Sequence, residues 1–172
     1  MPEQTNTNSR PHSRRHTFAI GSAQLQYDHE LLELSRVVRV VKGGRRFRFR
    51  ASVVIGDRAG RIGFGIGKSK DVQQAIQKAQ NAAQKSLVTI QLDERTIPHT
   101  VSAKYKSAVV MLKPARPGTG IIAGATIRTV ADLAGIRDLV AKSFGSANRV
   151  NAARATMKAL SHTYASPTRS AR

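Results

Sequence analysis

Cysteine and tryptophan are absent from this chain of 172 residues, and acidic residues are scarce. Without cysteine the sequence offers no disulfide framework, no thiol nucleophile and no cysteine-ligated zinc site. No stretch approaches the run of roughly 18 apolar residues that a membrane-spanning helix needs. The first residues, Met1-Pro2-Glu3, lack the order of a secretory signal, and Pro2 stands where a myristoylation signal requires glycine. We therefore expect a cytoplasmic protein with no membrane partner.

The dominant feature of the composition is positive charge. Twenty-nine Lys and Arg against ten Asp and Glu give a net charge of +19 and a pI of about 11.6. A compact protein with this charge repels itself, and binding to a polyanion relieves the repulsion. Nucleic acid is the usual polyanion and an anionic membrane is the alternative, which the missing membrane signals disfavour. Apolar residues make up 40% of the chain, which is ordinary for a globular fold.

Changes in composition divide the chain. Residues 1–27 form a basic, polar tail without apolar periodicity, and residues 163–172 form a second basic tail. Between them we expect two α+β domains, over residues 28–92 and 103–162, joined by a connector that contains Asp93, Glu94 and Pro98.

The first domain is predicted to contain three antiparallel strands and one helix. The first strand is expected at 36–41 and the third at 61–66. The second is expected to follow the turn at Gly43-Gly44 and to run to Ile55. The helix is expected over 70–87, with Ser69 as its N-cap. Its predicted buried stripe comprises Val72, Ile76, Ala79, Ala83 and Leu87.

The second predicted strand alternates clearly. Phe47, Phe49, Ala51, Val53 and Ile55 share one face, and Arg46, Arg48, Arg50 and Ser52 share the other. The two phenylalanines are therefore predicted to pack in the core and not to stack on bases.

The second domain has weaker patterns. We expect a strand over 105–112, a loop over 113–120 with strong helix and strand breakers, and a helix over 126–133. Residues 138–142 fit a short strand or helix, and an alanine-rich helix is expected over 151–162.

The most distinctive chemistry lies between residues 36 and 50, where seven of fifteen side chains are basic and none is acidic: Arg36, Arg39, Lys42, Arg45, Arg46, Arg48 and Arg50. Guanidinium groups bind phosphate oxygens with two parallel hydrogen bonds, and glycine at a turn permits close approach of the backbone. A solvated strand face is the alternative, but such faces usually mix both signs. The pattern therefore favours phosphate contact.

The glycine-rich segment 63–69 resembles a nucleotide-binding loop only superficially. A phosphate loop needs glycine five residues before its Gly-Lys-Ser, and Ile62 occupies that position. Two interpretations remain: a glycine-rich turn that presents a helix N-terminus to a phosphate, or close packing of strand and helix.

Catalytic and metal-binding patterns are weak. The five histidines show no metal-ligand spacing, and Asp93-Glu94 lies in the expected connector. We expect no enzymatic activity, no cofactor and no metal site.

Several motifs follow one another in order over residues 28–162: Val40-Val41-Lys42-Gly43-Gly44-Arg45 with Phe47, the segment 53–68, the segment 113–124 with Pro117-Gly118-Thr119-Gly120, Val130, Ala134-Gly135-Ile136, Ser143-Phe144-Gly145-Ser146 with Asn148, and Asn151 with Arg154 and Ala155. Together they resemble the family of the small-ribosomal-subunit protein S5. The sequence departs from the family pattern at Ala103, Lys106 and Ala125, where glycine is expected.

The resemblance implies a double-stranded-RNA-binding-like first domain and a βαβ-type second domain with a left-handed crossover. It implies a structural constituent of the small subunit that binds small-subunit rRNA, supports assembly and decoding accuracy, and lies near the messenger entry path beside proteins S4 and S8. The predicted rRNA-binding residues are Arg36, Arg39, Lys42, Gly43, Gly44, Arg45, Arg46, Arg48, Arg50, Arg61, Lys68, Lys70, Lys113, Arg116, Arg128 and Arg154. A free double-stranded-RNA-binding regulator is the alternative, although it would not require the segment 117–124.

Overall fold

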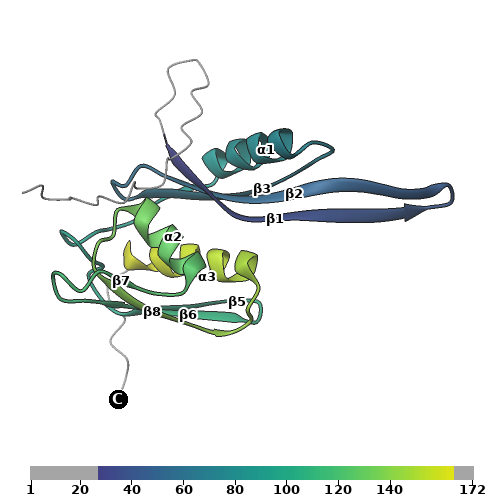
Figure 1. Ribbon diagram of the computed structural model, residues 1–172. Helices are drawn as coiled ribbons and strands as arrows, with labels where there is room; N and C mark the ends of the chain where they lie inside the picture. Colours follow the sequence, from purple (N-terminus) through teal and green to yellow (C-terminus); the bar gives the residue numbers. More distant parts are fainter. Residues whose placement is uncertain (1–26, 165–172) are drawn as a thin grey trace, which may run out of the picture.

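The computed structural model describes residues 27–164, so the predicted tails lie almost entirely outside it. Four layers follow one another in Figure 1: α1, a first sheet, the pair α2 and α3, and a second sheet. The strands are β1 (Asp28–Val41), β2 (Gly44–Gly56), β3 (Arg61–Ser69), β4 (Leu87–Thr89), β5 (Val101–Tyr105), β6 (Ala108–Pro114), β7 (Ile121–Ile122) and β8 (Leu139–Gly145). The helices are α1 (Val72–Lys85), α2 (Ala125–Ala134) and α3 (Arg149–Ser161), with a 3-10 turn η1 (His162–Tyr164). The predicted α+β class is confirmed.

The first sheet has the order β1-β2-β3-β4 and is antiparallel throughout. Its three long strands match the predicted ones, although β1 begins at Asp28 and β3 extends to Ser69. The fourth strand was not predicted. It has only three residues, Leu87–Thr89, and the predicted helix included the first of them.

The predicted helix was wrong at both ends. Asp71 caps α1, because its carboxylate accepts the Gln74 backbone N–H, and Ser69 instead ends β3 and donates its hydroxyl to Gln74 Oε1. Ala75, Ala79 and Ala83 form the buried stripe of α1. The larger apolar residues that we expected there, Val72 and Ile76, are only half-buried, and Leu87 lies in β4.

Glycine explains why alanine forms that stripe. Gly63, Gly65 and Gly67 alternate along β3, and a Cβ on each would collide with the backbone carbonyl of Ala83, Ala79 and Ala75 respectively. Small residues on both surfaces let the helix backbone approach the strand closely. The segment 63–69 is therefore a strand and not a turn, and its glycines fit the packing interpretation.

The second sheet is mixed, with the order β5-β6-β8-β7. The strand predicted over 105–112 was right for residues 108–112 but wrong at its start, because Lys106 and Ser107 form a turn between β5 and β6. Lys106 has φ of +53°, the conformation that favours the glycine expected there. β7 and β8 are parallel and flank α2, which gives the expected βαβ unit. Residues 138–142 belong mainly to a strand, β8.

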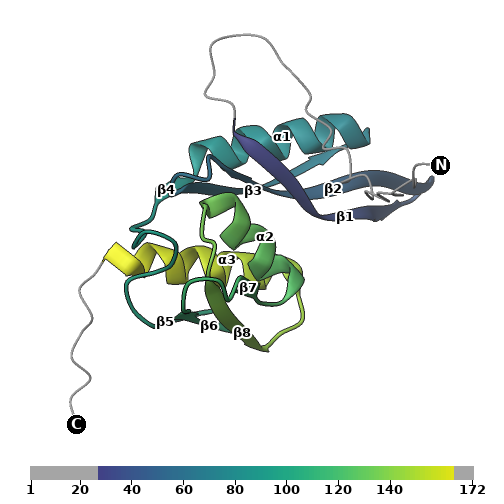
Figure 2. The same cartoon turned by 60° about the vertical axis from the view of Figure 1, so that its left-hand side comes forward.

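One apolar core joins the two sheets. It includes Val54 and Ile62 from the first sheet, Leu112 from the second, and Ile127 from α2. The expected connector contributes Ile97, which is 1% exposed. The layer of α2 and α3 lies between the sheets in all views (Figure 2).

The turn between β2 and β3 is bonded directly to the end of α2. The backbone N–H groups of Arg58 and Gly60 donate to the carbonyls of Leu133 and Ala134, at 3.0 and 3.1 Å. These carbonyls are among the last of the helix, which lack partners within it. Arg58 also forms ion pairs with Asp28 (2.9 Å) and Asp132 (3.7 Å). The two parts of the chain are thus joined by hydrogen bonds, by the Arg58–Asp132 ion pair and by apolar contacts.

Candidate nucleic-acid interface

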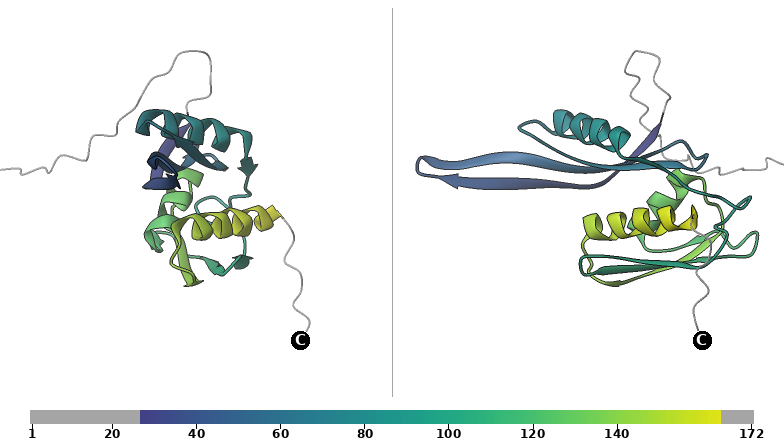
Figure 3. Two further views of the ribbon diagram at one scale, coloured as in Figure 1. Left: turned by 90° about the vertical axis from the view of Figure 1, so that its right-hand side faces the viewer. Right: turned by 180° about the vertical axis from the view of Figure 1, so that it is seen from behind.

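The β1–β2 hairpin projects well beyond the rest of the molecule (Figure 3, right). β3 pairs with β2 only as far as the pair Phe49–Ser69, whereas β1 and β2 stay paired to Val41 and Gly44. The free part therefore extends on the order of 20 Å, at about 3.4 Å per residue. A two-stranded ribbon of this kind is at best marginally stable alone, so an exposed one is suited to a partner that covers it.

The tip is a two-residue connection of Lys42 and Gly43. Gly44 has φ of +131°, which confirms a positive φ in the glycine pair. A Cβ at either glycine would meet no atom within 4 Å. The backbone at the tip is therefore open to close approach by a ligand.

The register assigns the basic residues to two faces. Directly opposed residues of an antiparallel pair share a face. Arg39 lies opposite Arg46, and Arg48 lies two residues further along the same face. Arg50 and its neighbour in β3, Lys68, continue this row. We call Arg39, Arg46, Arg48, Arg50 and Lys68 the cationic face; it is turned away from α1.

The opposite face of the hairpin tip is different. Arg36 lies opposite Phe49, Val38 opposite Phe47, and Val40 opposite Arg45. Phe49 packs against the core under α1, but Phe47, Val38 and Val40 are 43%, 48% and 75% exposed. The prediction that Phe47 lies in the core was wrong, because the strand continues past the end of the helix that would cover it.

Among residues 27–164, the tip cations Arg36, Arg39, Lys42, Arg45, Arg46 and Arg48 have no acidic partner within ion-pair distance. Arg50 differs, because its Nη2 lies 3.3 Å from Glu33 Oε1. The positive charge of the hairpin is therefore partly compensated at its base and uncompensated toward its tip. An array of unpaired guanidinium groups along an extended strand can bind successive phosphates.

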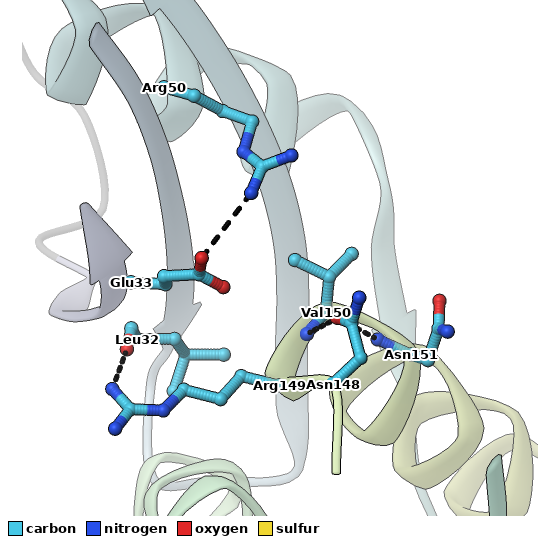
Figure 4. A network of polar contacts seen from close by, with 7 residues as sticks. All are labelled: Leu32, Glu33, Arg50, Asn148, Arg149, Val150 and Asn151. Carbon is cyan, nitrogen blue, oxygen red and sulfur yellow. Dashed lines mark hydrogen bonds and ion pairs between the residues drawn. The ribbon is translucent and has the colours of Figure 1, made fainter. Parts of the chain in front are cut away.

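The base of the hairpin is fixed to the body (Figure 4). A β-bulge between Leu31 and Glu33 places Leu32 in the shared core. Arg149, the first residue of α3, donates through Nη1 to the Leu32 carbonyl at 3.1 Å. Asn148 caps the same helix by accepting the N–H groups of Val150 and Asn151. The direction of the hairpin is thus coupled to the position of α3.

Two further predicted residues lie near the hairpin and one lies apart. Lys68 belongs to the cationic face, and Lys70 is exposed just before α1. Arg61 lies at the far end of β3, where it pairs with Asp57 at 3.9 Å. The structure therefore does not bring Arg61 to the hairpin.

Lys113 and Arg116, two further predicted contact residues, are both exposed. Lys113 lies near the end of β6, and Arg116 lies in the loop that follows. Asp138, 1% exposed, fixes this loop, because its Oδ1 accepts the Gly120 N–H at 2.8 Å. Arg95 Nε lies 3.2 Å from the other carboxylate oxygen, close enough for an ion pair but without the alignment of a hydrogen bond.

Arg128 and Arg154 are separate from both the hairpin and the loop after β6. Arg128 lies on α2 and lines a cavity of ≈ 530 Å³ together with Glu30 and Asp132. The guanidinium of Arg154 lies 5.4 Å from the ring centroid of Tyr105, donates a hydrogen bond to its hydroxyl, and lies 5.8 Å from the ring of Phe64. Arg154 thus bridges the two sheets, which gives it a structural role that its sequence position did not indicate.

Sequence reasoning missed two residues, Arg149 and Phe47. The signal for Arg149 was its position directly after the N-cap residue Asn148. Phe47 gave no signal of its own, because it alternates along the sequence like a core residue. Among the described residues, no helix is long and apolar enough to cross a membrane, and no group of His, Asp and Glu could hold a metal ion.

Comparison with known proteins gives two matches to family models. Residues 27–91 match the ribosomal protein S5 N-terminal domain, and residues 103–170 match the ribosomal protein S5 C-terminal domain. Small ribosomal subunit protein uS5 from two strains of Treponema pallidum, one of them the Nichols strain, is 48% identical over 135 residues. The alignment covers 78% of this chain and 78% of each relative. The chain therefore belongs to the ribosomal protein S5 family, whose members are structural components of the small ribosomal subunit.

Proposed function

We propose that this chain binds small-subunit rRNA through the β1–β2 hairpin and holds the RNA in place within the cytoplasmic ribosome. The observation that carries the proposal is the row of unpaired cations on a ribbon without a third strand or a covering helix. Such a ribbon is stabilised when phosphates neutralise its charge. The proposed role is structural and involves no catalysis, cofactor or metal.

The cationic face supplies the main phosphate contacts in this proposal, and Lys42 with Gly43 and Gly44 supplies the contacts at the tip. Lys113 and Arg116 form a second contact on the other side of the fold. Lys70 adds charge beside the hairpin. Arg61, Arg128 and Arg154 contribute less, because each is held by, or faces, groups of the protein itself.

The two parts of the chain have different roles in this proposal. Residues 28–92 bind RNA through the hairpin, and residues 103–162 position it through Arg149. The basic tails at 1–27 and 163–172 add to the attraction for RNA. Family resemblance further supports contacts with proteins S4 and S8, a place near the messenger entry path, and roles in assembly and decoding accuracy.

Co-sedimentation of the full chain with small ribosomal subunits tests this proposal. Retention through moderate-salt washes and release at high salt are expected of a component held mainly by phosphate contacts. Loss at the mildest wash, with the chain found free or on other RNA, would contradict the proposal and favour a free double-stranded-RNA-binding regulator.

A further inference from the structure

The side of the hairpin turned toward α1 carries exposed apolar and aromatic side chains that phosphate binding does not use. Phe47, Val38 and Val40 are exposed there, and the charged residues among them are Arg36 and Arg45. The guanidinium of Arg36 lies over the Phe47 ring, 3.7 Å from its centroid. We call Arg36, Val38, Val40, Arg45 and Phe47 the stacking face.

We propose that the stacking face binds an unpaired nucleobase of the rRNA, which stacks on the Arg36–Phe47 pair while the cationic face binds phosphates on the other side of the same ribbon. This inference rests on the proposed function and adds a second kind of contact. The hairpin then lies between two RNA segments and contacts RNA with both faces.

The geometry of the pair favours this ligand. Aromatic rings and guanidinium planes are the surfaces on which single-stranded bases stack, whatever their sequence. Arg36 and Phe47 are already stacked without RNA, so little side-chain freedom is lost when a base is added. The pair thus offers a preformed platform of two flat groups.

Charge identifies nucleic acid as the occupant. Every charged side chain from residue 34 to residue 50 is positive, on both faces of the hairpin. A nucleotide brings a phosphate with its base, so Arg45 matches the phosphate and the Arg36–Phe47 pair matches the base. An apolar protein surface would leave these cations without partners, at a cost in desolvation.

Chemical probing of the bases in assembled small subunits tests the inference. We compare subunits that carry the wild-type chain with subunits that carry Phe47→Leu, which keeps an apolar side chain but removes the ring. At least one unpaired base should become more reactive, by roughly fivefold or more if stacking has its usual strength. Phe47→Tyr keeps the ring and should leave the base protected.

Two further variants serve as a second test of the platform and as a control. Arg36→Lys keeps the charge but removes the flat guanidinium, so it should expose the same base and serves as a second variant if Phe47→Leu fails to fold. Phe144→Leu is the matched control, because Phe144 is 47% exposed on β8 and lies outside the hairpin. It should leave all base reactivities unchanged.

The outcomes separate the two proposals. Failure of the wild-type chain to bind subunits contradicts the proposed function, and this inference fails with it. Salt-sensitive binding of the wild-type chain with base reactivities that neither Phe47→Leu nor Arg36→Lys changes overturns this inference alone. A photo-crosslink from position 47 to a protein segment, including residues 1–26 of this chain, also overturns it.

Discussion

Arg149 donates a hydrogen bond to the backbone carbonyl of Leu32, and this bond joins the start of α3 to the bulge at the base of the hairpin. The two residues are 117 positions apart in the sequence. Their contact fixes the base of the hairpin to the second part of the chain. The base is held by the second part of the chain, and the tip is left free.

Arg149→Ala should loosen the base of the hairpin. The Leu32 carbonyl loses its partner, at a cost of about 1 kcal/mol. Amide hydrogen exchange at residues 33–36 should become roughly fivefold faster, which corresponds to the same free energy. Lys142→Ala, an exposed substitution on β8, is the control. Unchanged exchange at 33–36 in Arg149→Ala would show that the bond does not hold the hairpin.

Gly65→Ala should destabilise the fold. The added methyl group would collide with the Ala79 carbonyl, a backbone atom that no rotamer change can move. Overpacking of this kind typically costs about 1–3 kcal/mol, measured as a lower midpoint of urea unfolding. The matched control is Gly43→Ala, because its Cβ enters open space and its φ is not positive. Equal effects of the two substitutions would contradict the close-packing account of β3 and α1.

Asp138→Ala should destabilise the loop at 115–120 and lower the free energy of unfolding by roughly 1–3 kcal/mol, because the Gly120 N–H loses its acceptor. Asp138→Asn should cost less, since an amide oxygen can still accept that bond. Asp93→Asn, an exposed change, is the control. Denaturant unfolding of the three variants gives the order of their free energies of unfolding. An effect of Asp138→Ala no larger than that of Asp93→Asn would refute the role of the carboxylate.

The sequence was most informative where side chains alternate or repeat. The basic row of Arg46, Arg48 and Arg50 was assigned correctly to one face, because strand periodicity alone determines it. The turn at Gly43-Gly44 and the helix α2 were also predicted, from glycine chemistry and apolar spacing.

The errors came from contacts between distant segments. The alanine stripe of α1 depends on glycines in β3, so the larger residues expected in it, Val72 and Ile76, lie at its edge. Phe47 alternates like a core residue, but its exposure is set by where α1 ends. Similarly, Arg154 looked like a free cation, yet its guanidinium lies near the rings of Tyr105 and Phe64. Periodicity gives the face of a strand but not what covers that face.

The central claim is that the cationic face of the hairpin binds phosphates. The most direct test measures binding of the full chain to small-subunit particles depleted of it, at several salt concentrations. The double variant Arg39→Gln/Arg46→Gln is compared with Lys104→Gln/Lys142→Gln, which loses the same charge from exposed strand positions elsewhere. We predict that the hairpin variant binds more weakly and that its slope of log affinity against log salt falls by about 1.4–1.8, the contribution of two phosphate contacts. Equal slopes for the hairpin variant and the wild-type chain would contradict the account. Equal losses of affinity in the two double variants would also contradict it.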